Sequence, residues 1–400
     1  MRNSLYRTVH IGITAALLIA LSLACACSQT ALPPSATTTP ADPPSGAIDV
    51  PRELERALLD RKLVAQSLNN PRGMHRLASG ALLVAEAGTG DPDNPLTGAL
   101  TELSDRNADG DYLDEGERRV LLADQPSKNI LKIVRRDEVF GMAGIAEGKG
   151  QVLVARAFFG GPSHIFAIEG DATRPWGETH LNINDLAYDP PRDAWVGVAS
   201  TTDEVVRLVP GGGVERILKL PPLPNGQDSV PGYLRHDPVT GKVLVSLFTG
   251  SPEGEEGGEG TELVPRAGGI IALDPATRSF TWAVTGLTVP TDFEIASDGS
   301  IYVLEFCDAF LDPVGTREAM YQGASHGGFK RFSGRLLRVD RKSGQVTIVA
   351  EGLDAPSNLA LADGALYVAE GMGTPGRLIP APGGVRKLTG YIERIELPAP

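Results

Sequence analysis

Three stretches of the chain repeat one pattern of apolar and polar positions. They are residues 67–87 (SLNNPRGMHRLASGALLVAEA), 286–306 (GLTVPTDFEIASDGSIYVLEF) and 352–371 (GLDAPSNLALADGALYVAEG). In each stretch a leucine precedes a proline by three positions, and two short apolar runs follow, separated by a glycine-containing turn. Short apolar runs bounded by turn residues are typical of buried β-strands, and their recurrence indicates a repeat architecture.

Weaker copies of the same unit occupy the rest of the chain. They lie at residues 138–169, 181–219 and 228–284. Together with the three copies above they give six units of about 57 residues, which fits four-stranded blades around a central channel. The sequence therefore predicts an all-β fold, a six-bladed β-propeller over residues 59–400. The strands expected in the fifth unit are 292–296, 300–305, 334–340 and 346–350.

The last unit lacks its outer strand. Its predicted strands are 359–361, 365–370 and 391–397. Residues 62–68, near the other end of the chain, have the pattern of the missing strand. We therefore expect the N-terminal strand 62–68 to pair with the C-terminal blade and close the ring. Closure removes the exposed sheet edges that would otherwise seek partners, and we expect a monomer.

Strands that alternate in direction sort the connections onto two faces of a propeller. Turns between the first and second strands of a unit are tight. The connections between second and third strands are long in four units, at 87–98, 249–267, 306–333 and 371–388. We call the side on which they lie the long-loop face. Because long connections usually carry function, the sequence predicts that a small molecule or a protein partner binds at this mouth of the channel.

The first residues have the features of an export signal. Basic residues precede an apolar run from Ile11 to Ala24, which is too short and wrongly flanked for a membrane span. The run stops at Cys25 and Cys27, an arrangement that resembles the lipobox of bacterial lipoproteins. We expect residues 1–27 to be a lipoprotein signal peptide, with Cys25 or Cys27 lipidated and the domain held at a bacterial membrane, in the periplasm or outside the cell. A plain cleaved signal is the alternative.

Composition adds three further expectations. Residues 28–58 are rich in Pro, Ser and Thr at their start and are predicted to be a tether and lead-in. Beyond the signal, Cys307 is the only cysteine, so the domain has no internal disulfide, and we expect this thiol to be buried. The net charge of −13 argues against nucleic acid as a partner, because nucleic acids require a basic patch.

Polar and charged side chains gather at positions predicted to border the channel. Such a group is either a functional site or a network of structural ion pairs. The candidates for catalysis are Glu86, Asn184, Asp292, Glu305, Glu370 and, from the 306–333 loop, His326. The candidates for ligand binding are Arg72, Arg156 and Asn358.

Residues 105–117 (DRNADGDYLDEGE) predict a calcium site. Asp105, Asn107 and Asp109 are spaced by two and precede Gly110, as in the first half of an EF-hand loop. An EF-hand has glutamate at its twelfth position, but here Gly116 occupies it and Glu117 follows. The remaining ligands would come from Asp111, Asp114 or Glu117. Since the loop joins the third and fourth strands of the first unit, we expect this Ca²⁺ to be structural; an unliganded acidic turn is the alternative.

The repeats resemble a known group of proteins. NPRGM and GALLVAEAGTG near the start, with GRLLRVD, TIVAEGL and GALYVAEG near the end, are similar to ScyD/ScyE-like exported propellers. They also resemble the broader NHL-repeat and gluconolactonase-like six-bladed propellers. The resemblance covers about residues 60–397 and implies the fold.

Two enzyme groups within that resemblance can be compared residue by residue. Gluconolactonases hold one divalent ion in the channel with Glu, Asn, Asn and Asp, and open the lactone with a metal-activated water. Asn184 resembles one of these ligands, whereas Arg72, Thr291 and Ser357 occupy the corresponding positions elsewhere, and an arginine would repel the ion. Quinoprotein sugar dehydrogenases require a channel histidine near the quinone, and no histidine of this sequence matches it obviously.

Two functional hypotheses follow. The first is a lipid-anchored, Ca²⁺-stabilised propeller that binds a ligand or partner on the long-loop face without chemistry. The second is a gluconolactonase-like hydrolase or quinoprotein-like dehydrogenase that uses a divalent metal or a quinone in the channel. An axis closed by Arg72 or Arg156 paired with glutamate would favour the first hypothesis, and a metal or quinone bound on the axis would favour the second.

Overall fold

The structure is a computed structural model of the whole chain. It describes residues 46–130, 137–158, 161–170, 172–224, 226–250, 264–308, 325–326 and 329–398. The signal peptide, Cys25, Cys27 and the first part of the tether therefore lie outside the described residues. Within the described residues, no helix is long and apolar enough to cross a membrane.

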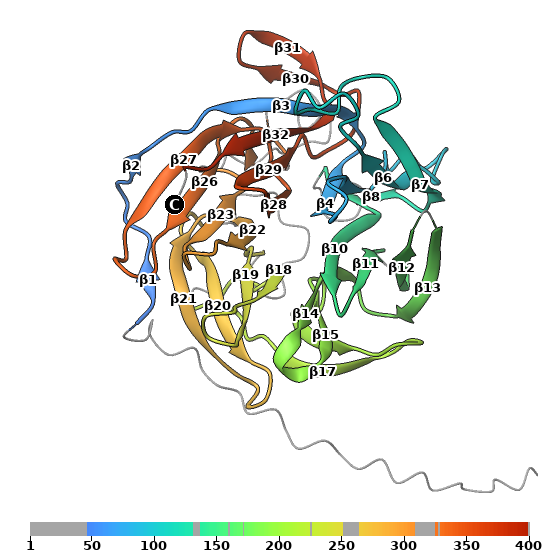
Figure 1. Cartoon of the computed structure of the whole chain (residues 1–400). Coiled ribbons are helices and arrows are strands. Elements are labelled where there is room, and N and C mark those ends of the chain that lie inside the picture. Colours follow the sequence, from blue (N-terminus) through green and yellow to red (C-terminus); the bar gives the residue numbers. More distant parts are fainter. Residues whose placement is uncertain are drawn as a thin grey trace, which may run out of the picture. The chain divides into compact units, whose positions relative to one another are not determined.

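The predicted all-β, six-bladed propeller is confirmed. Six sheets succeed one another around the ring (Figure 1). Blade 1 contains β4 (Pro71–Arg76), β5 (Leu82–Glu86), β6 (Gly98–Leu103) and β7 (Arg118–Gln125). Blade 2 contains β10 (Met142–Gly148), β11 (Gln151–Arg156), β12 (Ser163–Glu169) and β13 (Ala172–Thr179). Blade 3 contains β14 (Ile183–Asp189), β15 (Ala194–Ala199), β16 (Glu204–Leu208) and β17 (Val214–Lys219).

The second half of the ring follows the same plan. Blade 4 contains β18 (Pro231–His236), β19 (Val243–Leu247), β20 (Gly268–Asp274) and β21 (Ser279–Leu287). Blade 5 contains β22 (Pro290–Ile295), β23 (Ile301–Glu305), β26 (Gly334–Val339) and β27 (Val346–Leu353). Blade 6 contains β28 (Asn358–Ala362), β29 (Ala365–Glu370) and β32 (Gly390–Glu396), and takes β3 (Arg61–Leu68) as its outer strand.

The ring closes as the sequence predicts. Strand β3 runs antiparallel to β32, with Lys62 opposite Arg394 and Leu68 opposite Gly390. Val64 and Leu68 are buried against the same apolar cluster as Ile392. The N-terminal strand therefore joins blade 6 through both backbone pairing and side-chain packing, and no outer strand is missing from the circle.

The segment before β3 extends along the outer edges of two more blades. Strand β1 (Ile48–Asp49) pairs in parallel with β21, and β2 (Glu55–Arg56) pairs in parallel with β27 (Figure 1). Val50 between them is 1% exposed and packs into the core between blades 4 and 5. Composition placed these residues in a lead-in outside the propeller, but they continue the sheets of blades 4 and 5. Their extended backbone covers sheet edges that would otherwise stay unpaired.

Among the described residues, three pairs of short antiparallel strands lie in the connections between the strands of the blades. They are β8 (Lys128–Asn129) with β9 (Val139–Phe140), β24 (Ser325–His326) with β25 (Phe329–Lys330), and β30 (Leu378–Ala381) with β31 (Gly384–Lys387). The apolar cores lie between neighbouring blades, where the faces of adjacent sheets meet; the cluster around Phe293, for example, joins strands of blades 4 and 5. These cores hold the innermost strands rigidly around the axis.

Candidate functional site

The innermost strands place equivalent residues around the axis. In five blades the pairing of the first strand with the second shifts near its start, at a β-bulge or similar irregularity, so the residues there leave the regular ladder. Bulges of this kind redirect side chains. The equivalent positions are Gly73, Gly144, Asp185, Tyr233, Asp292 and, in the strand of blade 6, Asn358.

The two glycines in this set permit close packing of blades 1, 2 and 3. A Cβ atom on Gly73 would lie 2.2 Å from the carbonyl oxygen of Ala143, and one on Gly144 would lie 2.1 Å from Oδ1 of Asp185. Such distances are far below van der Waals contact, so any side chain would push the strands apart. Glycine at these positions therefore keeps the centre of the ring narrow.

Tyr233 crosses this narrow centre. Its hydroxyl donates a 2.9 Å hydrogen bond to the carbonyl oxygen of Arg72. Tyr233 lies in blade 4 and Arg72 in blade 1, which are three blades apart and face each other across the axis. Burial raises the pKa of Tyr233, so the phenol keeps its proton at physiological pH. The contact therefore bridges the channel between opposite blades.

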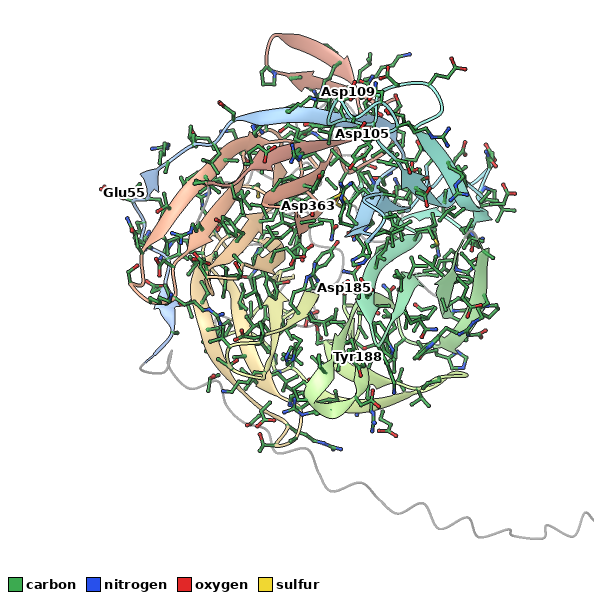
Figure 2. All side chains as sticks on the ribbon, in the orientation of Figure 1. Glu55, Asp105, Asp109, Asp185, Tyr188 and Asp363 are labelled. Carbon is green, nitrogen blue, oxygen red and sulfur yellow. The ribbon has the colours of Figure 1, made fainter. Side chains whose placement is uncertain are left out.

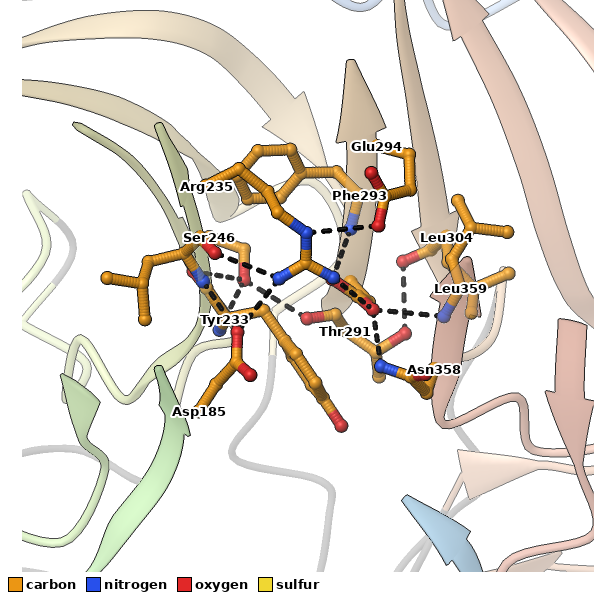
Figure 3. Close-up of polar contacts among 12 residues, drawn as sticks. Asp185, Tyr233, Arg235, Ser246, Thr291, Phe293, Glu294, Leu304, Asn358 and Leu359 are labelled. Atoms are coloured by element: carbon orange, nitrogen blue, oxygen red, sulfur yellow. Dashed lines mark hydrogen bonds and ion pairs between the residues drawn. The ribbon is translucent and has the colours of Figure 1, made fainter. Parts of the chain in front are cut away.

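Arg235, two residues further along β18, fills the axis beside Tyr233 (Figure 3). Its Nη1 donates to Asp185 at 2.9 Å and its Nη2 donates to both carboxylate oxygens of Asp292 at 3.0 and 3.1 Å. Its Nε donates to Glu294 at 3.0 Å. These bonds, with one from Nη1 to the carbonyl of Leu234, occupy the donors of the guanidinium group. Arg235 therefore joins blades 3, 4 and 5 at the axis.

Asp292 is the most deeply buried acid of this network. Besides Arg235, it accepts hydrogen bonds from Nδ2 of Asn358 at 2.6 Å and from the backbone N–H of Leu359 at 2.9 Å. Burial raises the pKa of Asp292, and the Arg235 guanidinium offsets only part of this effect. Burial likewise raises the pKa of Asp185. One guanidinium thus faces three carboxylates, which favours a retained proton among them.

The divalent-metal site of a gluconolactonase-like channel does not fit these residues. The side-chain amide of Asn184 donates to the carbonyl of Gly232 at 2.8 Å, and Asp292 is paired with Arg235. A divalent ion bound by Asp292 would sit beside a buried guanidinium and be repelled by it. Among the described residues, no group of three His, Cys, Asp or Glu side chains is arranged to hold a metal.

The three glutamates that end the repeated Val-x-Glu motif share one role. Each accepts a backbone N–H from the connection that leads into its own blade. The bonds are Asn69 N to Glu86 at 2.7 Å, Thr288 N to Glu305 at 2.6 Å and Asp354 N to Glu370 at 2.5 Å. All three side chains are buried, between 0 and 1% exposed. The motif therefore ties the end of the second strand to the start of the blade.

Each of these glutamates has a further partner from the third or fourth strand of its blade. Arg118 contacts Glu86 at 2.7 Å, Arg335 contacts Glu305, and the Tyr391 hydroxyl donates to Glu370 at 3.0 Å. Burial raises the pKa of Glu305 and of Glu370, and the neighbouring Glu393 raises that of Glu370 further. These contacts give the three candidates a structural role as buried acceptors.

The remaining ligand-binding candidates also have protein partners. Arg72 donates to Glu138 at 2.9 Å and to the carbonyl of Val139 at 3.0 Å, in the connection between blades 1 and 2. Arg156 donates to Gln125 at 3.2 Å, and burial lowers its pKa. Arg156 therefore differs from Arg72 in having no acid within ion-pair distance among the described residues.

The base of the long-loop face is braced by buried contacts. Phe248, Phe306 and Phe329 stack edge to face, with centroids 4.9 to 6.1 Å apart, and Cys307 is buried in the same cluster.

Thr374, in the long connection of blade 6, donates to Asp137 between blades 1 and 2. His326 lies in β24, but its side chain and most of the 306–333 loop lie outside the described residues.

The predicted calcium loop lies between β6 and β7, away from the long loops. Asp105 accepts N–H bonds from Ala108 at 2.6 Å and Gly110 at 2.9 Å, and the φ of Gly110 is +86°. The sharp turn and the carboxylates along it are those of a Ca²⁺-binding loop, but the side chains of these described residues, as they lie, are not gathered around a metal position. Nζ of Lys62 lies 3.0 Å from Asp111, and the Asn107 amide donates to Asp109 and Asp114. An ion would have to displace these contacts.

The opposite end of the channel, where first and second strands are joined by tight turns, contains a cavity of about 650 Å³. Arg235 and Glu294 lie in its lining, and its walls include Ala146, Ala187 and Ala360. These alanines occupy positions of the inner strands equivalent to Arg235, so short side chains leave the space open. Sequence reasoning missed both the cavity and Arg235. The available signal was the alignment of PGYLRH with PTDFEI, which sets Arg235 beside Glu294 in the next blade.

Comparisons with known proteins concern the fold. No protein-family model matches the chain, and no curated protein sequence matches it significantly. A gluconolactonase of Xanthomonas campestris is 15% identical, with a TM-score of 0.48 over 90% of this chain and 99% of that one. Virginiamycin B lyase of Staphylococcus aureus is 10% identical, with a TM-score of 0.44 over 83% and 99%. A protein of unknown function from Bacteroides thetaiotaomicron is 13% identical, with a TM-score of 0.48 over 82% and 70%. The structural neighbours are six-bladed propeller proteins.

Proposed function

We propose that this protein is an exported, lipid-anchored propeller that binds a small molecule or a protein partner on its long-loop face, without catalysing a reaction in the channel. The observation that carries this proposal is the closure of the axis. Tyr233 bridges opposite blades, and Arg235 is paired with Asp185, Asp292 and Glu294. At the level of Arg235 these paired groups occupy the axis, so a metal ion bound there by Asp292 would have to displace the guanidinium.

The buried glutamates support the same proposal. Glu86, Glu305 and Glu370 are the carboxylates that the repeat presents most regularly, and each accepts a backbone N–H and a side-chain donor from the third or fourth strand of its blade. A general base must be within reach of a substrate proton. Carboxylates that are almost fully buried and already bonded cannot reach one without disrupting the blade.

The absence of channel chemistry is tested by a turnover screen. Lactones and aldoses would be assayed with the purified protein in the presence of Ca²⁺ and added quinone. We expect no turnover above a heat-inactivated sample. Turnover that disappears in Asp292→Asn while the protein remains folded would replace this proposal with the hydrolase or dehydrogenase hypothesis.

The binding face is tested by site-specific photo-crosslinking in the producing cell. A crosslinking residue at Asp93, which is exposed in the 87–98 connection, samples the long-loop face. The matched control is Lys342, which is exposed in the turn between β26 and β27 on the other face. We expect adducts from position 93 that are absent from position 342. Equal labelling at both positions would contradict a binding surface confined to the long loops.

A further inference from the structure

The cavity at the tight-turn end of the channel has a floor and walls built from the innermost strands. Its floor is the network around Arg235, which separates it from the long-loop face. Three of the six equivalent wall positions are alanines, and this leaves about 650 Å³ open. Sites for small ligands in proteins typically have volumes of about 300–1,000 Å³. The cavity is therefore large enough for a small organic molecule, and it is distinct from the face discussed above.

The charges around this cavity are unbalanced. Its lining contains two guanidinium groups, those of Arg76 and Arg235, whereas the acids in or directly beneath it are Glu147, Glu294, Asp363, Asp185 and Asp292. Burial raises the pKa of Asp292 and of Asp185, so the network beneath the cavity retains a proton. Two guanidinium groups then face four ionised carboxylates, which leaves an excess of two negative charges among these described residues. The network at the floor has one arginine for three acids, and Glu294 is the acid of that network that reaches the lining.

His75, in the lining, does not correct this imbalance. His75 lies 3.2 Å from Glu147, and burial lowers its pKa, so it is mostly neutral at pH 7. The nearby Arg235 lowers the pKa of His75 further. His236 lies 3.3 Å from the buried Asp189, which brings another acid close to the wall. A positively charged ligand would thus be favoured by the electrostatic potential of the cavity.

The rest of the lining is apolar. It includes Met74, Ile145, Leu186, Ile295 and Leu361, contributed by the first strands of five different blades. Met74, Ile145 and Leu186 are buried in the cores between blades, whereas Ile295 and Leu361 keep side-chain surface that a ligand can cover. An apolar wall above an acidic floor matches a ligand that has one charged end and one hydrocarbon body. Burial of the hydrocarbon part contributes roughly 25 cal/mol per Å² of apolar surface removed from water.

We propose that this cavity binds an organic cation with an apolar body, of the alkylamine or arylalkylamine class. The cationic group lies at the acidic floor beside Glu294, and the hydrocarbon body lies along the walls formed by the partly exposed Leu77, Ile295 and Leu361. This site does not depend on binding at the long-loop face. Its occupant would contact the inner strands, but it would not cross the axis.

The test compares three probes that share a six-carbon body and differ in charge. Hexylamine, 1-hexanol and hexanoate would be titrated into the purified protein by calorimetry at pH 7. We expect hexylamine to bind at least tenfold more tightly than 1-hexanol, and hexanoate to bind more weakly than both. Preference for hexanoate would show that Arg235 and Arg76 govern an anion site instead. Equal affinity for all three, or no binding by any, would also overturn the proposal.

Variants locate the binding. Glu294→Gln removes one negative charge from the floor and should weaken hexylamine binding about tenfold while leaving 1-hexanol binding unchanged. The matched control is Glu178→Gln, because Glu178 is a half-exposed acid on β13, at the outer edge of blade 2. Ala362→Trp, in the wall of the cavity, should block all three probes and serves as the second variant if Glu294→Gln does not fold. Hexylamine binding that survives both changes would place the ligand elsewhere.

Discussion

The hydroxyl of Tyr233 donates to the backbone carbonyl of Arg72, 2.9 Å away, and thereby joins two blades that face each other across the ring. The residues are separated by 161 positions in the sequence. Beside this bridge, Arg235 pairs with acids of the two neighbouring blades (Figure 3). One of these acids, Asp185, lies near the centre of the ring (Figure 2). These contacts give the propeller a closed polar centre in place of an open channel.

Removal of the Tyr233 hydroxyl should weaken this closure measurably. Tyr233→Phe leaves the Arg72 carbonyl without its partner in a buried site, and we expect the free energy of unfolding to fall by about 1–2 kcal/mol. Tyr233→Ala also leaves a cavity and should cost about 3–5 kcal/mol. Urea denaturation followed by fluorescence measures both. Tyr188→Phe is the control, because that hydroxyl bonds the exposed Asp193 and its loss should change little. Equal effects of Tyr233→Phe and Tyr188→Phe would contradict a bridge at the axis.

The buried Asp292 should make stability depend on pH in a direction opposite to that of most salt-bridged acids. Its pKa is raised in the folded state, so the folded protein retains a proton that the unfolded chain releases above its ordinary pKa of about 4. The stability linked to this proton is present at low pH and is lost as the pH rises toward the raised folded value. The asparagine of Asp292→Asn mimics the protonated acid, so its cost relative to the parent protein should shrink from pH 5 to pH 8.

Thermal melting of the parent protein and of Asp292→Asn at a series of pH values measures how the difference in their stability changes with pH. The control is Asp340→Asn, since backbone hydrogen bonds lower the pKa of Asp340 and keep it ionised throughout the range. Its effect should be constant between pH 5 and pH 8. A constant difference between Asp292→Asn and the parent protein would mean that Asp292 is fully ionised at pH 5, against the prediction.

Glu305, which ends the repeated Val-x-Glu motif in blade 5, should contribute to the stability of the fold. Glu305→Gln weakens the charge-assisted bonds to Thr288 N–H and Arg335, and we expect it to lower the free energy of unfolding by about 2 kcal/mol. The matched control is Glu351→Gln, because its pair with Arg56 is exposed and should contribute less than about 1 kcal/mol. Chemical denaturation distinguishes them. If the two substitutions lower the free energy of unfolding equally, the buried bonds from Thr288 N–H and Arg335 to Glu305 do not contribute more stability than an exposed ion pair.

Calcium should stabilise the protein through the loop between β6 and β7. We expect added Ca²⁺ to raise the melting temperature by a few degrees, in line with about 1–2 kcal/mol of ligand-linked stability, and a chelator to reverse this. Asp105→Ala should abolish the response because Asp105 organises the turn. Lys62→Met should enlarge it, since the Lys62 ammonium group lies beside Asp111 and competes with an ion. An unchanged melting temperature with Ca²⁺ and with chelator would refute a calcium site here.

The lipid anchor is predicted from the signal sequence alone. If Cys25 or Cys27 is lipidated, the parent protein should be recovered in the membrane fraction, and the Cys25→Ala, Cys27→Ala double variant should be recovered in the soluble exported fraction. The two single variants identify which cysteine carries the lipid. Fractionation with immunodetection measures the distribution, and an unchanged soluble distribution of parent and variants would favour a plain cleaved signal.

The sequence by itself determined the blades, their order and the closing pair. These features depend on short-range alternation of apolar and polar residues, and on a repeat whose copies can be compared directly. Strand β3 was predictable for that reason, because residues 62–68 match the outer strand that blade 6 lacks. The position of the calcium-like loop between β6 and β7 followed from the same alignment.

The role of the repeated pattern of charges within the ring depends on the tertiary structure. The Val-x-Glu glutamates were placed at the channel by their position in the repeat, but burial and backbone partners give them a structural role. The closure by Tyr233 and Arg235, and the cavity beneath it, depend on which side chains from different blades meet at the axis. Those distances are set when the ring closes and the glycines at 73 and 144 let the inner strands approach. The local pattern of apolar and polar residues does not predict these distances, because each partner lies a whole blade or more away along the chain.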